Sequence, residues 1–241
     1  MAKFGIITGA SSGIGAELAK LAVADGYELL LVADTPFVDP SANLPGAQTL
    51  EVDLSTFEGV DRLLAAAAGR RIDLLCANAG HGLGRGFLDQ DVAEWRHVID
   101  TNITGTVYLL QKVLKQMVAQ GEGKVLVTGS IAGWMPGSFQ AVYNGTKAFV
   151  DNFTAAIRNE LKEHKGITIT TLEPGPVETE FFKRADMMDT SVGQSDSKSD
   201  PADVAKDGWK ALMAGKDTII SGLMNKLQVA DRKSTRLNSS H

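Results

Sequence analysis

The sequence predicts a single α/β domain in which helices cover both faces of a doubly wound parallel sheet. Short apolar runs alternate along the chain with helical patterns, which is typical of strands joined by right-handed helical crossovers. The apolar runs are continuous rather than alternating, as expected for strands that are buried on both faces. The chain has 241 residues, of which 44% are hydrophobic, and is long enough to bury one sizeable core.

Hydrophobic periodicity places each element. We expect strands at residues 3–8, 28–33, 48–52, 72–77, 124–128, 167–172 and 218–221. We expect helices at residues 13–25, 57–68, 91–120, 139–163, 201–214 and 223–230. Three prolines in residues 34–46 disfavour a helix between the second and third strands. Residues 185–200 have little apolar periodicity, and we expect a loop there.

Composition limits the kinds of partner and the compartment. The formal net charge of -5 argues against a nucleic-acid-binding surface, which is usually basic. The one cysteine, Cys76, can form no intramolecular disulfide and lies in an apolar run, so we expect a buried thiol. The sequence has no apolar stretch of membrane-spanning length and no signal-peptide pattern, so we expect no membrane partner and a cytoplasmic location.

The last residues, 231–241, read DRKSTRLNSSH. This string is the in-frame translation of a common sequencing-library adapter. We therefore expect residues 1–230 to form the natural domain, truncated at its C-terminus, and residues 231–241 to be adapter read-through without a function. The natural protein is then expected to continue past Ala230 with a different sequence.

A glycine-rich turn joins the first strand to the first helix and reads Thr-Gly-Ala-Ser-Ser-Gly-Ile-Gly over residues 8–15. Glycines permit a tight turn and close backbone approach, while the helix N-terminus supplies N–H groups and a positive dipole for a pyrophosphate. Such a turn can be merely structural, but its place at the first crossover favours a dinucleotide site in a Rossmann-like fold. The cofactor-binding residues expected in this turn are Gly9, Ser11, Ser12, Gly13, Ile14 and Gly15.

Two further signals lie in the second half of the chain. Tyr143 and Lys147 have i, i+4 spacing on an expected helix, which puts them on one face. A nearby ammonium favours phenolate and lowers a tyrosine pKa toward the range needed by an acid/base for alcohol–ketone exchange. Such pairs are also common on solvated helix faces. Ser130 ends the fifth strand, where it can hydrogen-bond a carbonyl oxygen or act as a turn residue.

Together these features resemble the single-domain branch of the short-chain dehydrogenase/reductase family over about residues 3–230. Residues 8–15 match the family's cofactor turn, and residues 77–80 match its Asn-Asn-Ala-Gly motif with Ala77 in place of the first Asn. Residues 174–179, Pro-Gly-Pro-Val-Glu-Thr, match its Pro-Gly-x-Val-x-Thr motif. Four residues fall, in order and spacing, at the family's catalytic positions: Asn102, Ser130, Tyr143 and Lys147.

The resemblance implies an NAD(P)-dependent oxidoreductase that transfers hydride between a nicotinamide cofactor and a small secondary alcohol, ketone or aldehyde. Tyr143 would exchange the proton with the substrate oxygen, and Ser130 would hold that oxygen. Lys147 would lower the pKa of Tyr143 and bind the nicotinamide ribose, while Asn102 would support a water. The remaining cofactor-binding residues implied are Asp53, Leu54, Asn78, Ala79, Gly80, Pro174, Gly175, Val177 and Thr179, of which Asn78 would brace the fourth strand.

NAD(H) is favoured over NADP(H) as the cofactor. Asp34 ends the second strand, near where a carboxylate would accept from a ribose 2′-OH and repel a 2′-phosphate. No Arg or Lys occurs between Glu28 and Glu51 to hold that phosphate. In the family's register, Asp34 stands one place beyond the usual NAD-type aspartate.

Other side chains are candidates for a pocket wall or a lid, with core packing as the competing interpretation: His81, Trp134, Met135, Phe139, Phe181, Phe182, Met187 and Met188. His97 and His164 have the positions of helix-surface residues. No group of His, Cys and carboxylate residues has metal-ligand spacing, so no metal is expected.

The helices expected at residues 91–120 and 139–163 resemble those that the family pairs across a two-fold axis, which implies a homodimer or homotetramer. Five apolar residues would then face either the sheet or a partner subunit: Val107, Leu110, Val113, Leu114 and Met117.

Two alternative functions stay open. One is a non-catalytic nucleotide-sensing relative, which would need none of Ser130, Tyr143 and Lys147. The other is an epimerase or dehydratase of the extended branch, which usually has different glycine spacing and a longer substrate domain.

Overall fold

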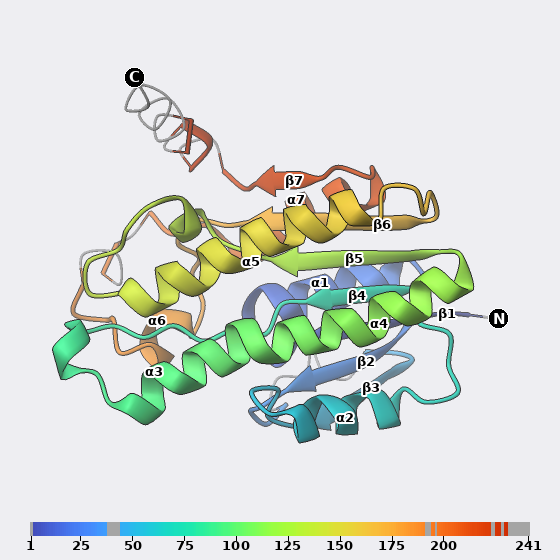
Figure 1. Ribbon diagram of the computed structural model, residues 1–241, viewed down its shortest axis with the longest axis horizontal. Coiled ribbons are helices and arrows are strands. Elements are labelled where there is room, and N and C mark those ends of the chain that lie inside the picture. The colour runs from blue at the N-terminus through green and yellow to red at the C-terminus, as the bar shows by residue number, and fades with distance from the viewer. Residues whose placement is uncertain are drawn as a thin grey trace.

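The computed structural model describes residues 2–37, 44–190, 194–195, 197–222, 225–227 and 229–230. Within these residues the chain forms a parallel seven-stranded sheet with the strand order β3-β2-β1-β4-β5-β6-β7 (Figure 1). The strands are β1 Lys3–Thr8, β2 Tyr27–Ala33, β3 Ala47–Glu51, β4 Leu74–Ala77, β5 Gly123–Thr128, β6 Ile167–Glu173 and β7 Thr218–Ile220.

The strand order reverses at β1, which pairs with β2 on one side and with β4 on the other. Thr8 pairs with Val32, and Ile7 pairs with Cys76, so the carboxyl ends of these strands reach the same edge of the sheet. In an open α/β sheet, ligands bind in the crevice beyond the carboxyl ends of the strands at such a switch point. The fold therefore positions a site beside the turns that follow β1 and β4.

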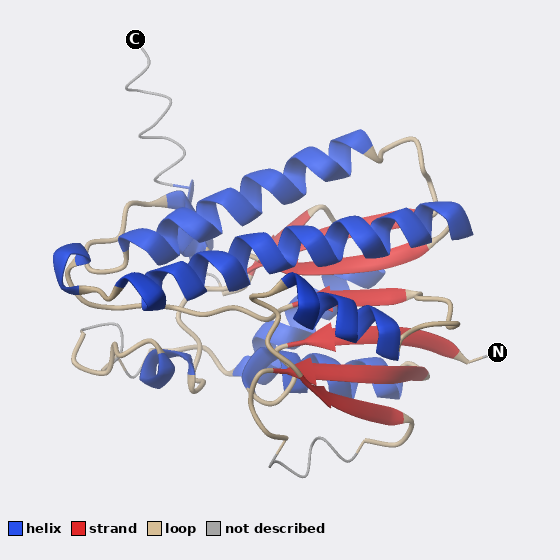
Figure 2. Cartoon of the chain, turned by 60° about the horizontal axis from the view of Figure 1, so that its bottom comes forward, coloured by secondary structure: helices blue, strands red, loops and turns tan. Residues whose placement is uncertain are grey.

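Helices cover both faces of the sheet (Figure 2). One face packs against α1 Gly13–Ala24 and α7 Pro201–Met213. The other packs against α2 Phe57–Ala66, α4 Thr106–Gln120 and α5 Ala141–Glu160. Each face has its own buried apolar cluster, which explains why the strands read as continuous apolar runs. The shorter helical segments are Phe87–Asp89, α3 Val92–Ile99, the π-helical turn Asp100–Gly105, Ile131–Trp134 and α6 Phe181–Arg184.

The fold class and the order of elements are confirmed, with most boundaries shifted by one to three residues. The helix expected at 91–120 is interrupted by the π-helical turn Asp100–Gly105, which sequence periodicity does not reveal. The short helix α6 was not predicted and begins just after the Pro-Gly motif. No helix occurs in the described part of residues 34–46, whereas residues 38–43 and 231–241 lie outside the described residues.

The apolar side chains of α4 face the sheet rather than a partner subunit. Leu110, Val113, Leu114 and Met117 are all buried within the monomer, while Val107 is half-buried. Cys76 is buried in the centre of the sheet, as expected, and burial raises the pKa of its thiol. Among the described helices, none combines the length and the apolar character needed to cross a membrane.

Candidate active site

A cleft of about 390 Å³ lies beyond the carboxyl ends of the strands. It brings together segments from the whole length of the domain, because each crossover returns the chain to this edge of the sheet. The predicted site residues that line it are Gly9, Ser11, Ser12, Gly13, Ile14, Asp34, Asp53, Leu54, Asn78, Ala79, Gly80, Ser130, Tyr143, Lys147, Pro174, Gly175, Val177 and Thr179. Two predicted residues, Gly15 and Asn102, are not among the residues that line the cleft.

The glycine-rich turn has the tight geometry that the sequence predicts. Gly9 has a φ of 63°, and a Cβ atom there would approach the Cα atom of Ala79 to 2.9 Å. At Gly15 a Cβ atom would lie 2.1 Å from the carbonyl oxygen of Gly9, so a side chain would push α1 off the turn. Ser12 caps α1 without a side-chain capping bond, which leaves the first N–H groups of the helix directed at the cleft.

Asn78 ties three strands together beneath this turn. Its side-chain amide donates to the carbonyl oxygens of Thr8 at 3.2 Å and Gly9 at 3.3 Å. Its Oδ1 atom accepts from the Thr128 hydroxyl at 3.0 Å. The side chain thus links the ends of β1, β4 and β5, which is the bracing contact expected for Asn78.

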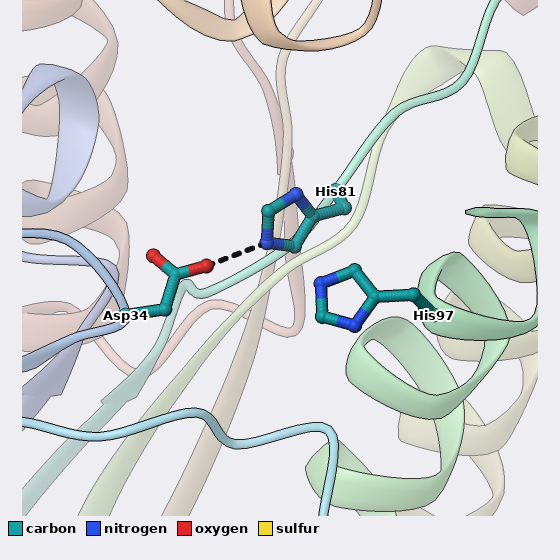
Figure 3. A group of neighbouring side chains, drawn as sticks. All are labelled: Asp34, His81 and His97. Atoms are coloured by element: carbon teal, nitrogen blue, oxygen red, sulfur yellow. Dashed lines mark hydrogen bonds and ion pairs between the residues drawn. The ribbon is translucent and has the colours of Figure 1, made fainter. Parts of the chain in front are cut away.

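Asp34 and His81 line the cleft, and His97 lies next to them (Figure 3). The Asp34 carboxylate lies 2.7 Å from Nε2 of His81, and the imidazole of His97 lies beside His81 with ring centroids 4.6 Å apart and ring planes tilted by 59°. The hydrogen bond with His81 lowers the pKa of Asp34, and the positive charge of Arg184 adds to this effect against the opposing effect of burial. Asp34 is therefore ionised at neutral pH. Sequence spacing did not reveal this group because its members come from three separate segments.

Asp53 lies further along this side of the cleft. Its carboxylate accepts from the backbone N–H and the hydroxyl of Ser55, both at 2.8 Å. These bonds hold the turn between β3 and α2, so Leu54 is fixed against the cleft.

Ser130, Tyr143 and Lys147 meet at the other end of the cleft, as predicted. The Ser130 Oγ atom accepts from the backbone N–H of Ala132 at 3.1 Å, and it also hydrogen-bonds the Tyr143 hydroxyl. Lys147 is buried, and its Nζ atom donates to the carbonyl oxygen of Thr128 at 2.8 Å. The i, i+4 spacing on α5 puts the ammonium 6.0 Å from the centroid of the Tyr143 ring.

The predicted lowering of the Tyr143 pKa by Lys147 is wrong for this arrangement. Burial raises the pKa of Tyr143 to about 12, an effect that the Ser130 hydrogen bond opposes and the charge of Asp151 reinforces. Burial also lowers the pKa of Lys147 to about 8, against the opposing charge of Asp151, so the ammonium form still predominates at neutral pH. The neutral, proton-donating form of Tyr143 therefore predominates at neutral pH.

Asp151 is a half-buried acid with both carboxylate oxygens shielded from solvent, and the sequence did not indicate it. It follows Lys147 by one helical turn on α5 and packs against the turn after β5, where a Cβ atom at Gly133 would approach its Oδ2 atom to 2.4 Å. Burial and the charge of Glu173 raise its pKa, while Lys147 and the backbone of Ser130 oppose that rise. The one available signal was its i, i+4 spacing from Lys147.

Asn102 occupies the π-helical turn and fastens it to the loop after β4. Its Nδ2 atom donates to the carbonyl oxygen of His81 at 2.8 Å and to the Thr146 hydroxyl at 2.9 Å. Its Oδ1 atom accepts from the backbone N–H of His81 at 2.8 Å. Asn102 is not among the residues that line the cleft. Its side-chain amide is used to hold the backbone of His81.

The segment after β6 covers the cleft between its two ends. Thr179 packs on the glycine-rich turn, where a Cβ atom at Gly13 would approach its Cγ2 atom to 2.8 Å. The rings of Phe181 and Tyr143 lie 5.2 Å apart, so Phe181 forms a wall beside the phenol. Met135, Phe182 and His81 also line the cleft, as predicted for pocket residues.

Four other candidates for the pocket or lid lie elsewhere. Trp134 points away from the cleft and donates from Nε1 to Glu173 at 2.8 Å. Met187 packs in a small apolar cluster with Phe182 and Ala185. Phe139 and Met188 are exposed. The structure thus assigns these four to packing or to the surface.

A glycine-rich turn at the switch point and a serine, tyrosine and lysine in the same cleft define a class, the nucleotide-dependent oxidoreductases. Residues 3–189 match the profile of the short chain dehydrogenase family. The chain belongs to this family. An uncharacterized oxidoreductase of Staphylococcus epidermidis is 31% identical over 190 residues, which are 76% of this chain and 82% of that protein. An uncharacterized oxidoreductase of Staphylococcus saprophyticus is 30% identical over 219 residues, 87% of this chain and 91% of that protein.

Solved structures agree with this assignment. A short-chain dehydrogenase from Sphingobium yanoikuyae in complex with NADPH is 26% identical, with a TM-score of 0.85 over 99% of this chain and 96% of that one. A short chain dehydrogenase/reductase from Burkholderia phymatum in complex with NAD is 21% identical, with a TM-score of 0.89 over 100% and 96% of the two chains, and shows the shared fold. The activity supported is nicotinamide-dependent oxidoreduction, and the sensing and epimerase alternatives are not favoured.

Proposed function

We propose that the protein reversibly transfers hydride between a nicotinamide cofactor and a small secondary alcohol, ketone or aldehyde, with Tyr143 as the acid/base. The observation that carries this proposal is the half-buried Tyr143, whose hydroxyl hydrogen-bonds Ser130 in the same cleft as the glycine-rich turn. That arrangement gives one proton donor and one oxygen-binding hydroxyl beside a dinucleotide-binding turn. When bound, the nicotinamide supplies or accepts the hydride.

In the reducing direction Tyr143 donates its proton to the carbonyl oxygen while Ser130 donates a hydrogen bond to the same atom. Two donors at one oxygen stabilise the negative charge that develops there as hydride arrives. The raised pKa of Tyr143 keeps the phenol protonated for this step at neutral pH. Phe181 and Met135 supply an apolar wall that excludes water from the reacting oxygen.

Lys147 would hold the nicotinamide ribose of the cofactor. Its Nζ atom is already fixed by the Thr128 carbonyl, so the ammonium is preorganised. Asn102 acts through other residues, because it fixes the loop that carries His81 and the helix that carries Thr146. The glycine-rich turn and the N-terminus of α1 would bind the pyrophosphate, while Val177 and Thr179 would hold the carboxamide.

A Tyr143→Phe substitution tests the proposal. It removes the hydroxyl and keeps the ring against Phe181, so we expect kcat/KM to fall by at least about 10²-fold on the best substrate from a panel of ketones and alcohols. Tyr108→Phe is the matched control, because the Tyr108 hydroxyl donates to Asp61 on the surface, and it should retain activity. Undiminished turnover in Tyr143→Phe would rule out the proposed mechanism.

The cofactor preferred by the protein is NAD(H) in this proposal. Its support is the ionised Asp34 carboxylate at the edge of the cleft, which would accept from a ribose 2′-OH and repel a 2′-phosphate. Arg184 also lines this part of the cleft and supplies a positive charge from the segment after β6. The carboxylate and the guanidinium therefore act on a 2′-phosphate in opposite directions, and the proposal gives the greater weight to the directly adjacent Asp34.

The protein forms a homodimer or homotetramer in this proposal, through the outer surfaces of α4 and α5. Phe149 on α5 is 41% exposed and stacks with Phe153 at 5.7 Å, an apolar pair on the surface. Phe149→Glu should lower the mass measured by light scattering at micromolar concentration, whereas Leu88→Glu, at an exposed apolar residue outside α4 and α5, should not. A monomeric wild type would reject the proposal.

A cytoplasmic location without nucleic-acid or membrane partners stays a prediction from the sequence.

A further inference from the structure

Three side chains of types that can bind metal ions, Asp34, His81 and His97, lie close together (Figure 3). Asp34 follows β2, His81 lies in the loop after β4, and His97 lies on α3. One ligand atom from each lies within 4.8 Å of the other two, and the two atoms joined between Asp34 and His81 are 2.7 Å apart. The fold thus assembles two imidazoles and one carboxylate from segments that are separate in the sequence.

The donor set has the chemistry of a transition-metal site. Two imidazole nitrogens and one carboxylate oxygen bind Zn²⁺ at about 2.0–2.2 Å in many proteins. Tetrahedral geometry at these bond lengths separates neighbouring donors by roughly 3.3 Å. The Asp34–His81 spacing is 2.7 Å and all three donors lie within 4.8 Å of one another, so we expect small rotations of the side chains to bring the donors into range.

The backbone around the trio is already fixed. Asn102 holds both the N–H and the carbonyl oxygen of His81 at 2.8 Å, which sets the position of that ligand. His97 is carried by helix α3, which begins at a capped N-terminus where Asp91 accepts from Ala93. Ligands on rigid elements lose little freedom when a metal binds, which favours affinity. The charge of Arg184 near Asp34 opposes a cation, and the ionised carboxylate offsets it.

We propose that Asp34, His81 and His97 form a binding site for Zn²⁺ or a similar transition-metal ion, and that metal and dinucleotide exclude each other. Asp34 and His81 both line the cleft, so a metal ion that they held would lie in the space proposed for the cofactor. The exclusion rests on the proposed function, in which Asp34 accepts from the ribose of the cofactor. The metal is therefore an inhibitor of cofactor binding and takes no part in hydride transfer.

The test is calorimetric titration of the full chain with Zn²⁺, without dinucleotide. The wild type should bind one equivalent. His97→Ala should weaken binding at least tenfold, and because His97 lies outside the cleft lining it should leave the KM of the cofactor within about twofold. His164→Ala, at an exposed histidine outside the trio, should bind Zn²⁺ as the wild type does. Mg²⁺ should not bind, because it prefers oxygen ligands.

Competition is measured separately by the fluorescence of bound NADH. Saturating Zn²⁺ should raise the Kd of NADH at least tenfold in the wild type and in His164→Ala, and leave it unchanged in His97→Ala. Zn²⁺ binding that is absent, or equal in His97→Ala and the wild type, overturns the metal site. Zn²⁺ binding that depends on His97 but leaves the Kd of NADH unchanged overturns the exclusion and the ribose assignment of Asp34, while the assignment of Tyr143 is untouched.

Discussion

The two ends of the cleft place ionisable groups under opposite conditions. At the open end Asp34 has a hydrogen-bonding partner in His81, and its pKa is lowered, so the charged form is stabilised. At the more buried end Lys147 is buried and Tyr143 and Asp151 are half-buried, and desolvation shifts each pKa toward the neutral form. A single cleft about 390 Å³ in volume therefore contains one environment that favours charge and one that suppresses it.

This difference corresponds to two separate tasks. Recognition of a dinucleotide uses fixed charges, which act at a distance and tolerate partial exposure to solvent. Proton transfer uses groups whose charge changes during the reaction, and these respond most strongly to desolvation. We therefore expect changes of pH to alter the rate of proton transfer, mainly through the buried end. Changes of charge at the open end should alter the preference between NAD(H) and NADP(H).

The largest expected effect is the pH dependence of alcohol oxidation. Oxidation needs the phenolate of Tyr143, and the raised pKa makes this form scarce at neutral pH, so its fraction increases as pH rises. We expect kcat for oxidation to rise by up to about tenfold per pH unit over the alkaline range, and kcat for ketone reduction to show no such rise. Saturating substrates between pH 6 and 10 would show this, and equal profiles in the two directions would contradict the comparison.

The next effect concerns the open end. Asp34→Arg replaces the charge that repels a 2′-phosphate with one that attracts it, so the ratio of kcat/KM for NADH to that for NADPH should fall at least tenfold, about 1.4 kcal/mol. The proton-transfer end should be unaffected, so the pH profile should keep its shape. Asp89→Arg, on an exposed turn, gives the same change of net charge and should leave the ratio unchanged. A wild type that prefers NADPH by tenfold or more would refute the assignment.

The smallest effect is on stability. The pKa of Asp151 is higher in the folded protein than in the unfolded chain, where it is near 4. Protonated Asp151 therefore contributes to the free energy of unfolding below about pH 4, and this contribution is lost as pH rises through the folded-state pKa. Asp151→Asn removes the charge. The difference in Tm between variant and wild type should therefore be more positive at pH 8 than at pH 4, by at least about 2 °C, or roughly 1 kcal/mol.

Asp203→Asn, at an exposed position of α7, serves as the control for this stability measurement. It should show a much smaller change of Tm difference between the two pH values, because an exposed carboxylate is little affected by folding. A difference at Asp151 that is independent of pH would mean that its charge is not suppressed in the folded protein.

Local patterns in the sequence predicted most of the fold and much of the cleft. The glycine-rich turn and the Tyr143–Lys147 spacing are short-range signals, and each helix or strand imposes its own period on the chain. The cluster of Asp34, His81 and His97 could not be found in this way, because Asp34 and His81 are 47 residues apart and meet only after the sheet has formed. The sign of the Tyr143 pKa shift also depends on burial, which sequence spacing does not report.

The two hydrogen bonds between the Asn102 side chain and the backbone of His81 affect how fast a dinucleotide can enter the cleft. Because that backbone is fixed at both its N–H and its carbonyl oxygen, the contact between His81 and Asp34 can open by rotation of the imidazole alone. Side-chain rotations take picoseconds to nanoseconds, whereas loop displacements take nanoseconds to microseconds. Entry of a dinucleotide at this end is then expected to be limited by diffusional encounter, and its rate should vary with solvent viscosity.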